Sequence, residues 1–189
     1  MKYFPYSLVA AANDWEESPA LTMAEAEIAL TKAFKDYFQQ LESLRGRVSE
    51  SAWEFFRNGS GERGLHDARL LNFTIGDGLS YVPDGSAPYR LNRQAAEARI
   101  EFINYEQTFH YQFRATGIRR STSTFEADDF YPKRHFGDLY IYELTVSEDH
   151  HLGLGFLFAD GAEISLEFRK LIFRRSRLRR RYPVNAMYD

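Results

Sequence analysis

The residues with the clearest chemical potential are a histidine and an aspartate that adjoin in the sequence. His66 and Asp67 could act as a general base and its orienting carboxylate, or as two ligands of a metal ion. They precede an expected strand, however, and neighbouring strand residues point to opposite faces of a sheet. We therefore expect His66 to pack or hydrogen-bond at that strand and Asp67 to cap nearby backbone. A hydrolase centred on this pair is the alternative.

A second group of residues forms a candidate anion-binding patch. His110 and Arg114 alternate with apolar residues along one expected strand, and Arg99 lies on the polar side of another. Cationic side chains gathered in this way would pair with carboxylates or phosphates. A solvated sheet face explains the same pattern, so both interpretations stay open.

Basic residues concentrate near the C-terminal end of the chain. Residues 169–181 contain eight lysines and arginines and no acidic residue, which leaves sixteen basic residues against all 27 acidic ones elsewhere. The arginines that could form a binding arm are Arg174, Arg175, Arg177, Arg179, Arg180 and Arg181. Such an arm could bind nucleic acid through its phosphates, but no aromatic residue lies among them to stack on bases. We expect this end to lie on the acidic body of the protein, with its arginines already paired.

The composition excludes several classes of site. The chain of 189 residues has no cysteine, which rules out disulfides, thiolate nucleophiles and Cys-ligated zinc and is consistent with a reducing cytoplasm. Glycines at 59, 61 and 64 match the spacing of a dinucleotide-binding loop, but a helix precedes them and a strand follows, the reverse of the required order. We predict no cofactor and no metal, and no apolar run is long enough to span a membrane.

Helical patterns occupy the first part of the chain. Thr22 and Glu25 fit a capping box, and Gly46 is expected to end the helix that they begin. An apolar stripe runs along this helix at spacings of three and four, formed by Leu30, Phe34, Tyr37, Leu41 and Leu44. A short second helix is expected to begin near Ser51.

From residue 65 onward the apolar residues recur with period two, which is typical of strands. The expected strands lie at 71–75, 98–102, 109–115, 139–146, 152–158 and 164–168. A three-residue loop at 159–161 would set Phe156 opposite Ile164 and keep the large side chains on one face, with Gly161 left-handed. By the same rule, a loop at 76–78 would set Ile75 opposite Leu79.

These elements predict an α+β fold, in which N-terminal amphipathic helices pack on an antiparallel meander sheet of about six or seven strands. We treat residues 1–189 as a single domain. It has a mainly helical part at 1–58, an antiparallel β part at 65–173 and a basic C-terminal end at 174–189. Two long connections, 83–95 and 118–137, could be functional loops or edge coverings, and the second is expected to include a short helix.

The order of these elements around one short motif carries a resemblance. An aromatic N-terminus, an amphipathic helix and a short helix precede Leu65-His66-Asp67-Ala68, and a β-rich half follows. This arrangement resembles uncharacterised bacterial domains that carry a Leu-His-Asp-Ala signature. The resemblance implies a bacterial origin and no established activity, so it transfers no catalytic residue.

With no convergent catalytic set and no cofactor cradle, we expect a non-enzymatic interaction domain in the cytoplasm whose partner is another protein. An acidic body could neutralise a basic partner, by analogy with the immunity proteins of toxin systems. Nucleic-acid binding through the arginine-rich end is a further alternative.

Overall fold

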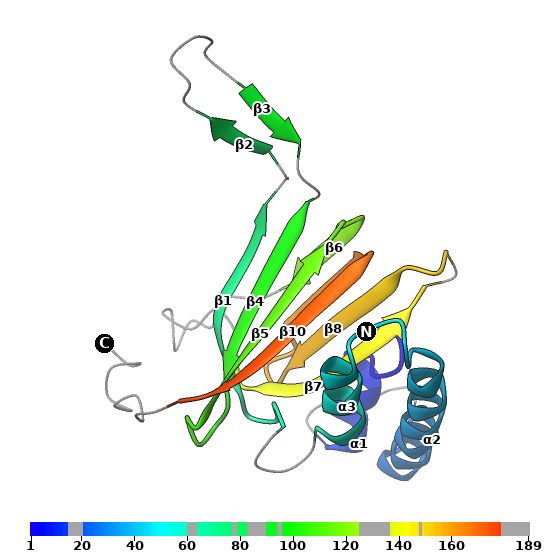
Figure 1. The fold of residues 1–189 in the computed structure, drawn as a ribbon. Coiled ribbons are helices and arrows are strands. Elements are labelled where there is room, and N and C mark those ends of the chain that lie inside the picture. The colour runs from blue at the N-terminus through cyan, green and yellow to red at the C-terminus, as the bar shows by residue number, and fades with distance from the viewer. Residues whose placement is uncertain are drawn as a thin grey trace.

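The structure is a computed structural model of the chain, and Figure 1 shows its fold. It describes residues 1–14, 21–59, 64–76, 79–82, 90–93, 96–124, 137–147 and 149–178, with backbone alone at 79–82 and 90–93. The helices are α1 (Tyr6–Ala12), α2 (Met23–Ser43) and α3 (Glu50–Asn58). The strands are β1 (Arg69–Gly76), β2 (Leu79–Val82), β3 (Arg90–Arg93), β4 (Glu97–Ile103), β5 (Phe109–Thr116), β6 (Arg120–Thr124), β7 (Leu139–Val146), β8 (Leu152–Phe158), β9 (Glu163–Phe168) and β10 (Lys170–Arg177).

The predicted α+β class is confirmed, but the sheet is divided. Within the described residues, one four-stranded antiparallel sheet has the order β1-β4-β5-β10 and a second has the order β6-β9-β8-β7. Strands β2 and β3 form a separate two-stranded hairpin. The strand pairing predicted around a loop at 76–78 is therefore wrong, because Ile75 lies opposite Ala98 of β4 and not opposite Leu79.

The chain passes between the two four-stranded sheets at a bend that two pairs of consecutive strands share. β5 pairs with β10 in the first sheet, and the segments that continue them, β6 and β9, pair with each other in the second. The bend lies at residues 117–119 on one strand and at Arg169 on the other, where Gly117 has a φ of +70°. Strands that pass from one sheet to the next in this way make the corners of sheet packings. About six or seven strands were expected, whereas these two sheets contain eight, because β6 and β10 were not among the expected strands.

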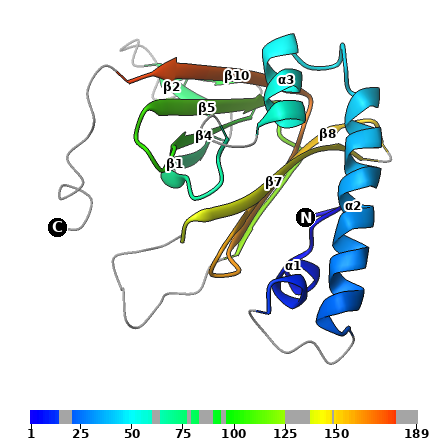
Figure 2. The ribbon, with the colours of Figure 1, turned by 90° about the horizontal axis from the view of Figure 1, so that it is seen from below.

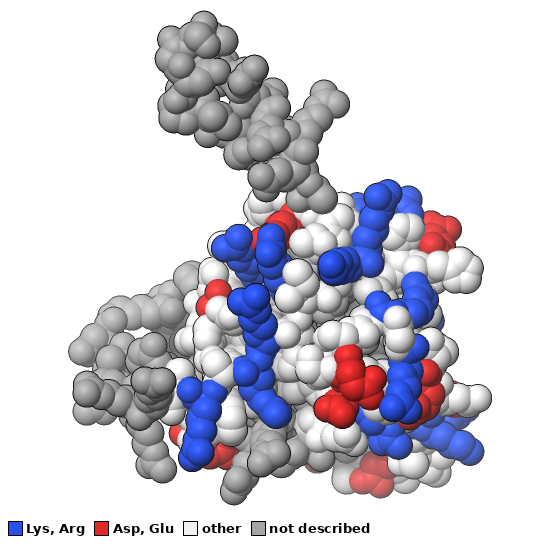
Figure 3. All heavy atoms as spheres, viewed as in Figure 1, with Lys and Arg blue, Asp and Glu red and all other residues white. Residues whose placement is uncertain are grey.

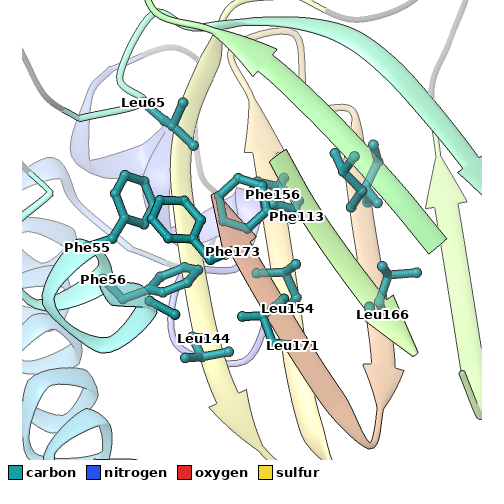
Figure 4. Packing of buried hydrophobic residues seen from close by; sticks show 14 of the residues in the cluster. Phe55, Phe56, Leu65, Phe113, Leu144, Leu154, Phe156, Leu166, Leu171 and Phe173 are labelled. Atoms are coloured by element: carbon teal, nitrogen blue, oxygen red, sulfur yellow. The ribbon is translucent and has the colours of Figure 1, made fainter. Parts of the chain in front are cut away.

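Aromatic side chains fill the space between the two sheets. The ring centroids of Phe102 and Phe156 lie 4.9 Å apart, and those of Phe113 and Phe156 lie 5.4 Å apart, so β4, β5 and β8 meet at one cluster (Figure 4). Phe55 of α3 joins it, 4.6 Å from Phe173 of β10. Offset-stacked and edge-to-face geometries are the favoured ones for aromatic pairs. This cluster joins α3 to both sheets.

The helices meet the sheets at their end strands. Figure 2 shows α2 lying alongside α1 and close to β7, while α3 lies beside β10. The capping box of Thr22 and Glu25 is present, and α2 ends three residues before Gly46. Tyr37, Leu41 and Leu44 are buried as the stripe predicts, but Phe34 is 37% exposed and contacts Phe4 from one side. α3 begins one residue before Ser51, with Ser49 as its N-cap.

Three strands of the β half were not predicted, and one of them, β3, lies in the connection 83–95. β6 lies in the connection 118–137 that was interpreted as a loop, and the expected short helix there falls on 125–136, outside the described residues. β10 covers part of the basic end that was expected to lie on the acidic body. Most of the connection 83–95 also lies outside the described residues.

Candidate functional site

The sheet β1-β4-β5-β10 has one face turned toward the core and one toward solvent. On β10 the buried Leu171 and Phe173 pair with the buried Ala115 and Phe113 of β5. Directly opposed residues of an antiparallel pair share a face, so the residues between them lie on the other side. This side, which we call the outer face, is formed by Glu97, Arg99 and Glu101 of β4, by His110, Gln112, Arg114 and Thr116 of β5, and by Lys170, Ile172, Arg174 and Ser176 of β10.

The outer face unites the predicted anion patch. Arg99 and Arg114 lie directly opposite each other on β4 and β5, and Glu97 forms an ion pair with each. The separation is 2.7 Å between Arg99 Nε and Glu97 Oε1. Hydrogen bonds from the two guanidinium groups, first that of Arg114, hold the pKa of Glu97 below its ordinary value. His110 is paired likewise, with Nε2 3.0 Å from Glu101 Oε2.

Sequence reasoning found the cations of this patch and missed the two glutamates that hold them. Period two places residues 97, 99 and 101 on one face of β4, and that signal was available in the sequence. What it could not give is the register between β4 and β5, which brings Glu97 within reach of Arg114. Two like charges that oppose each other across a ladder repel, and Glu97 offsets that repulsion.

The basic end is part of the same sheet. Arg174 lies on the outer face opposite Gln112, whereas Arg175 and Arg177 lie on the inner face opposite Tyr111 and Phe109. The guanidinium of Arg175 lies 5.5 Å from the Phe109 ring centroid, a cation–π contact. The expected ion pairs with an acidic body are not found, because Arg174 and Arg177 pair with no acid in the described part of the chain. Arg179, Arg180 and Arg181 lie outside it.

The sheet β1-β4-β5-β10 is therefore mainly positively charged. The four strands contain two acidic residues, Glu97 and Glu101, and seven basic ones, Arg69, Arg99, Arg114, Lys170, Arg174, Arg175 and Arg177. The second sheet has the opposite balance, with Arg120 against Glu143, Glu163 and Glu167. Figure 3 shows basic side chains spread over the front of the molecule, where this first sheet lies.

His66 and Asp67 are brought together, contrary to the prediction. They form a turn before β1 in which Asp67 has a φ of +60°, so the strand rule that separates neighbouring side chains does not apply. His66 Nδ1 lies 3.0 Å from Asp67 Oδ2, and the side chains are 60% and 53% exposed. The backbone N–H of Asp67 donates to the Leu139 carbonyl, 2.8 Å away, and the His66 ring lies 5.2 Å from that of Tyr140. The pair is a solvent-exposed dyad on a turn that docks against β7.

Polar side chains among residues 149–151, which precede β8, contact Arg119. His151 Nδ1 lies 3.1 Å from a guanidinium nitrogen of Arg119, and Asp149 lies 3.6 Å from the same group. The backbone reverses through His150, whose φ is +60°. No three His, Asp or Glu side chains gather as metal ligands anywhere in the described ranges. Of the glycine motif, residues 60–63 fall outside those ranges, and α3 precedes it and β1 follows it.

Comparisons with known protein families, with curated protein sequences and with solved structures find no significant match. The resemblance through Leu65-His66-Asp67-Ala68 therefore stays a prediction. Among the helices of the described residues, none is both long enough and apolar enough to cross a membrane.

Proposed function

We propose that this chain is a non-enzymatic interaction domain that docks the acidic surface of a protein partner on its outer face. The observation that carries the proposal is the position of β10, which adds Lys170 and Arg174 to the face that already holds Arg99 and Arg114. Along the sequence these residues form two separate groups. On the sheet they form one exposed polar surface with a positive balance.

Two of the cations on the outer face are paired with a glutamate and two are not, and this difference supports a partner with a defined shape. Arg99 and Arg114 each form an ion pair with Glu97, which favours the positions that they already occupy. Lys170 and Arg174 are exposed and have no acidic partner among the described residues. Charges that are already positioned favour the specificity and orientation of binding. Unpaired charges on the surface increase the association rate with the partner.

A carboxylate-bearing protein fits this surface better than a nucleic acid does. The outer face carries no aromatic side chain on which a base could stack. Glu97 and Glu101 lie within the cationic area and would repel a continuous line of phosphates, whereas a folded acidic surface can place its charges around them. An immunity-type role, as expected from the sequence, pairs an acidic surface with a basic partner, so it would not use the outer face.

The dyad supports a hydrolase less well. The described contacts of His66 are Asp67 and the Tyr140 ring, both at an exposed turn. General base catalysis requires a substrate held near the base and shielded from water. The proposal includes a cytoplasmic location, which the lack of cysteine favours, and the bacterial origin that the resemblance implies.

Binding of a fluorescein-labelled polyglutamate peptide, followed by fluorescence anisotropy, tests the proposal. The double variant Lys170→Gln/Arg174→Gln should weaken binding about tenfold, since two exposed charges are lost from the outer face. The matched control is Arg175→Gln/Arg177→Gln, which removes the same charge from the same strand but from the inner face. The control should retain affinity within about twofold.

Two outcomes overturn the proposal. Equal losses in the two double variants would mean that net charge, and not the outer face, attracts the peptide. Tighter binding of a labelled single-stranded or duplex DNA, with an affinity that falls steeply as salt rises, would favour the nucleic-acid alternative.

A further inference from the structure

A cleft lies between α3 and the end of β10, away from the outer face. Its volume is about 370 Å³, within the range of small-molecule sites. The residues that line it are Ser51, Glu54, Phe55, Asn58 and Gly59 from α3 and its end, and Phe173 and Arg175 from β10. Because Arg175 lies on the inner face, the cleft is separated from Arg174 by the thickness of the sheet.

The bottom of the cleft is aromatic and rigid. Phe55 and Phe173 are 4% and 8% exposed, and their rings stack with centroids 4.6 Å apart and planes inclined by 27° (Figure 4). On its other side Phe55 stacks on Tyr142, with a centroid distance of 5.3 Å. The Tyr142 hydroxyl donates to the Gly59 carbonyl, 2.6 Å away, and so fixes the end of α3. The packing of Phe55 between Phe173 and Tyr142 therefore holds the floor in place.

The walls carry opposite charges. Ser51, Glu54 and Asn58 recur at helical spacing, so α3 presents them along one side. Arg175 approaches from β10, and its guanidinium is held over Phe109. Neither Glu54 nor Arg175 forms an ion pair with a described residue, although both line the same cleft. The two charged groups flank one cleft and do not pair with each other. Each can therefore form an ion pair with an oppositely charged group of a ligand bound between them.

From these contacts we infer that the cleft binds a free amino acid with an aromatic side chain. Arg175 pairs with the ligand carboxylate, Glu54 with its ammonium group, and the ring lies against the floor of Phe55 and Phe173. The amide of Asn58 and the hydroxyl of Ser51 supply further hydrogen bonds at the rim. The inference does not rest on the proposed function, because the two sites use opposite faces of β10.

Isothermal titration calorimetry with L-phenylalanine tests this site. Arg175→Gln and Glu54→Gln should each weaken binding about tenfold, because each removes a charge-assisted contact. Arg174→Gln and Glu50→Gln are matched controls: the first changes the neighbouring residue on the opposite face, and the second changes a glutamate one turn earlier on α3. Both controls should bind as the parent does. All four side chains are exposed, so thermal unfolding should confirm that every variant folds.

Two fragments separate the contributions of the two charges. Binding of 3-phenylpropanoate, which lacks the ammonium group, should depend on Arg175 and not on Glu54, and binding of 2-phenylethylamine should show the reverse dependence. The inference is overturned if L-phenylalanine does not bind, if Arg174→Gln weakens it as much as Arg175→Gln, or if Glu54→Gln leaves its affinity unchanged. The polyglutamate titration can succeed or fail independently, since it depends on Arg174 and not on Arg175.

Discussion

Glu143 is the carboxylate that the described part of the chain buries most deeply, at 3% exposure. It lies on β7, where it accepts hydrogen bonds from the backbone N–H groups of Lys2 and Tyr3, the latter 3.0 Å away. Gly155 of the neighbouring strand leaves room for it, since a Cβ there would lie 3.2 Å from its Cγ. Burial raises the pKa of Glu143 above 4.5 despite these hydrogen bonds, because desolvation disfavours its charged form.

Stability should therefore fall as pH rises through the titration of Glu143. A folded-state pKa above the unfolded value means that the native protein binds more protons, so the free energy of unfolding decreases from about pH 4.5 upward. Glu143→Gln abolishes this titration. Urea unfolding should show that the stability of the parent, relative to this variant, is greater at pH 4 than at pH 7.

Glu27→Gln, which changes an exposed carboxylate of α2, is the control and should not reproduce that trend. Lys2 and Tyr3 donate to different oxygens of Glu143, and glutamine replaces one of these oxygens with an NH₂ group that cannot accept. Glu143→Gln therefore costs some stability at every pH. The trend with pH is the informative quantity. A parent that gains stability relative to Glu143→Gln as pH rises would contradict the assignment of Glu143 as a desolvated acid.

The positions of the candidate side chains could be predicted for residues in strands, where period two assigns each residue to a face. They could not be predicted for residues in a turn. Period two alone places Arg99 and Arg114 on polar faces, as observed. His66 and Asp67 were expected to diverge, and they converge because Asp67 adopts a left-handed conformation before β1. Aspartate is one of the few residues that adopt it readily, so a turn was an available alternative.

At the scale of elements, local pairings were predictable and long-range ones were not. In the β8–β9 hairpin, Phe156 lies opposite Ile164 and Gly161 has a φ of +85°, as the matching of large side chains predicts. The same matching of large side chains failed for β1. Its partner is β4, and the β2–β3 hairpin lies between β1 and β4 in the sequence. β10 was missed because its arginines mask the alternation of Leu171 and Phe173.

The left-handed position in the β8–β9 hairpin gives a test of its packing. Gly161→Ala should destabilise the protein by about 2 kcal/mol, because an L-residue is strained at this φ and its Cβ would lie 3.2 Å from the Tyr6 ring. Gly46→Ala is the control, with the same φ of +85° and nothing within 4 Å of its Cβ. It should cost about 1 kcal/mol in urea unfolding. Equal losses would show that Tyr6 does not pack on this hairpin in solution.

At the scale of the whole molecule, the bend of the sheet and the position of the charge have one origin. The chain crosses the bend between β5 and β6 and between β9 and β10. These crossings determine the register of β10 against β5, and therefore the face of the sheet on which each arginine lies. Composition revealed that the basic residues cluster near the C-terminus. It could not reveal that they divide between two faces, because that depends on pairing with a strand about 60 residues earlier.

Two truncations test whether the basic segment is a strand of the sheet. Residues 174–177 pair with 109–112 of β5, and the Leu178 N–H donates to the Thr108 carbonyl, 2.8 Å away. A chain that ends after Phe173 loses these hydrogen bonds and uncovers Tyr111, which is fully buried. It should unfold in urea with roughly 2–4 kcal/mol less stability than a chain that ends after Leu178, at a contribution of about 1 kcal/mol for each net hydrogen bond. The two differ only in residues 174–178. A solvated arginine tail would give nearly equal stabilities, and that result would contradict the pairing of β10 with β5.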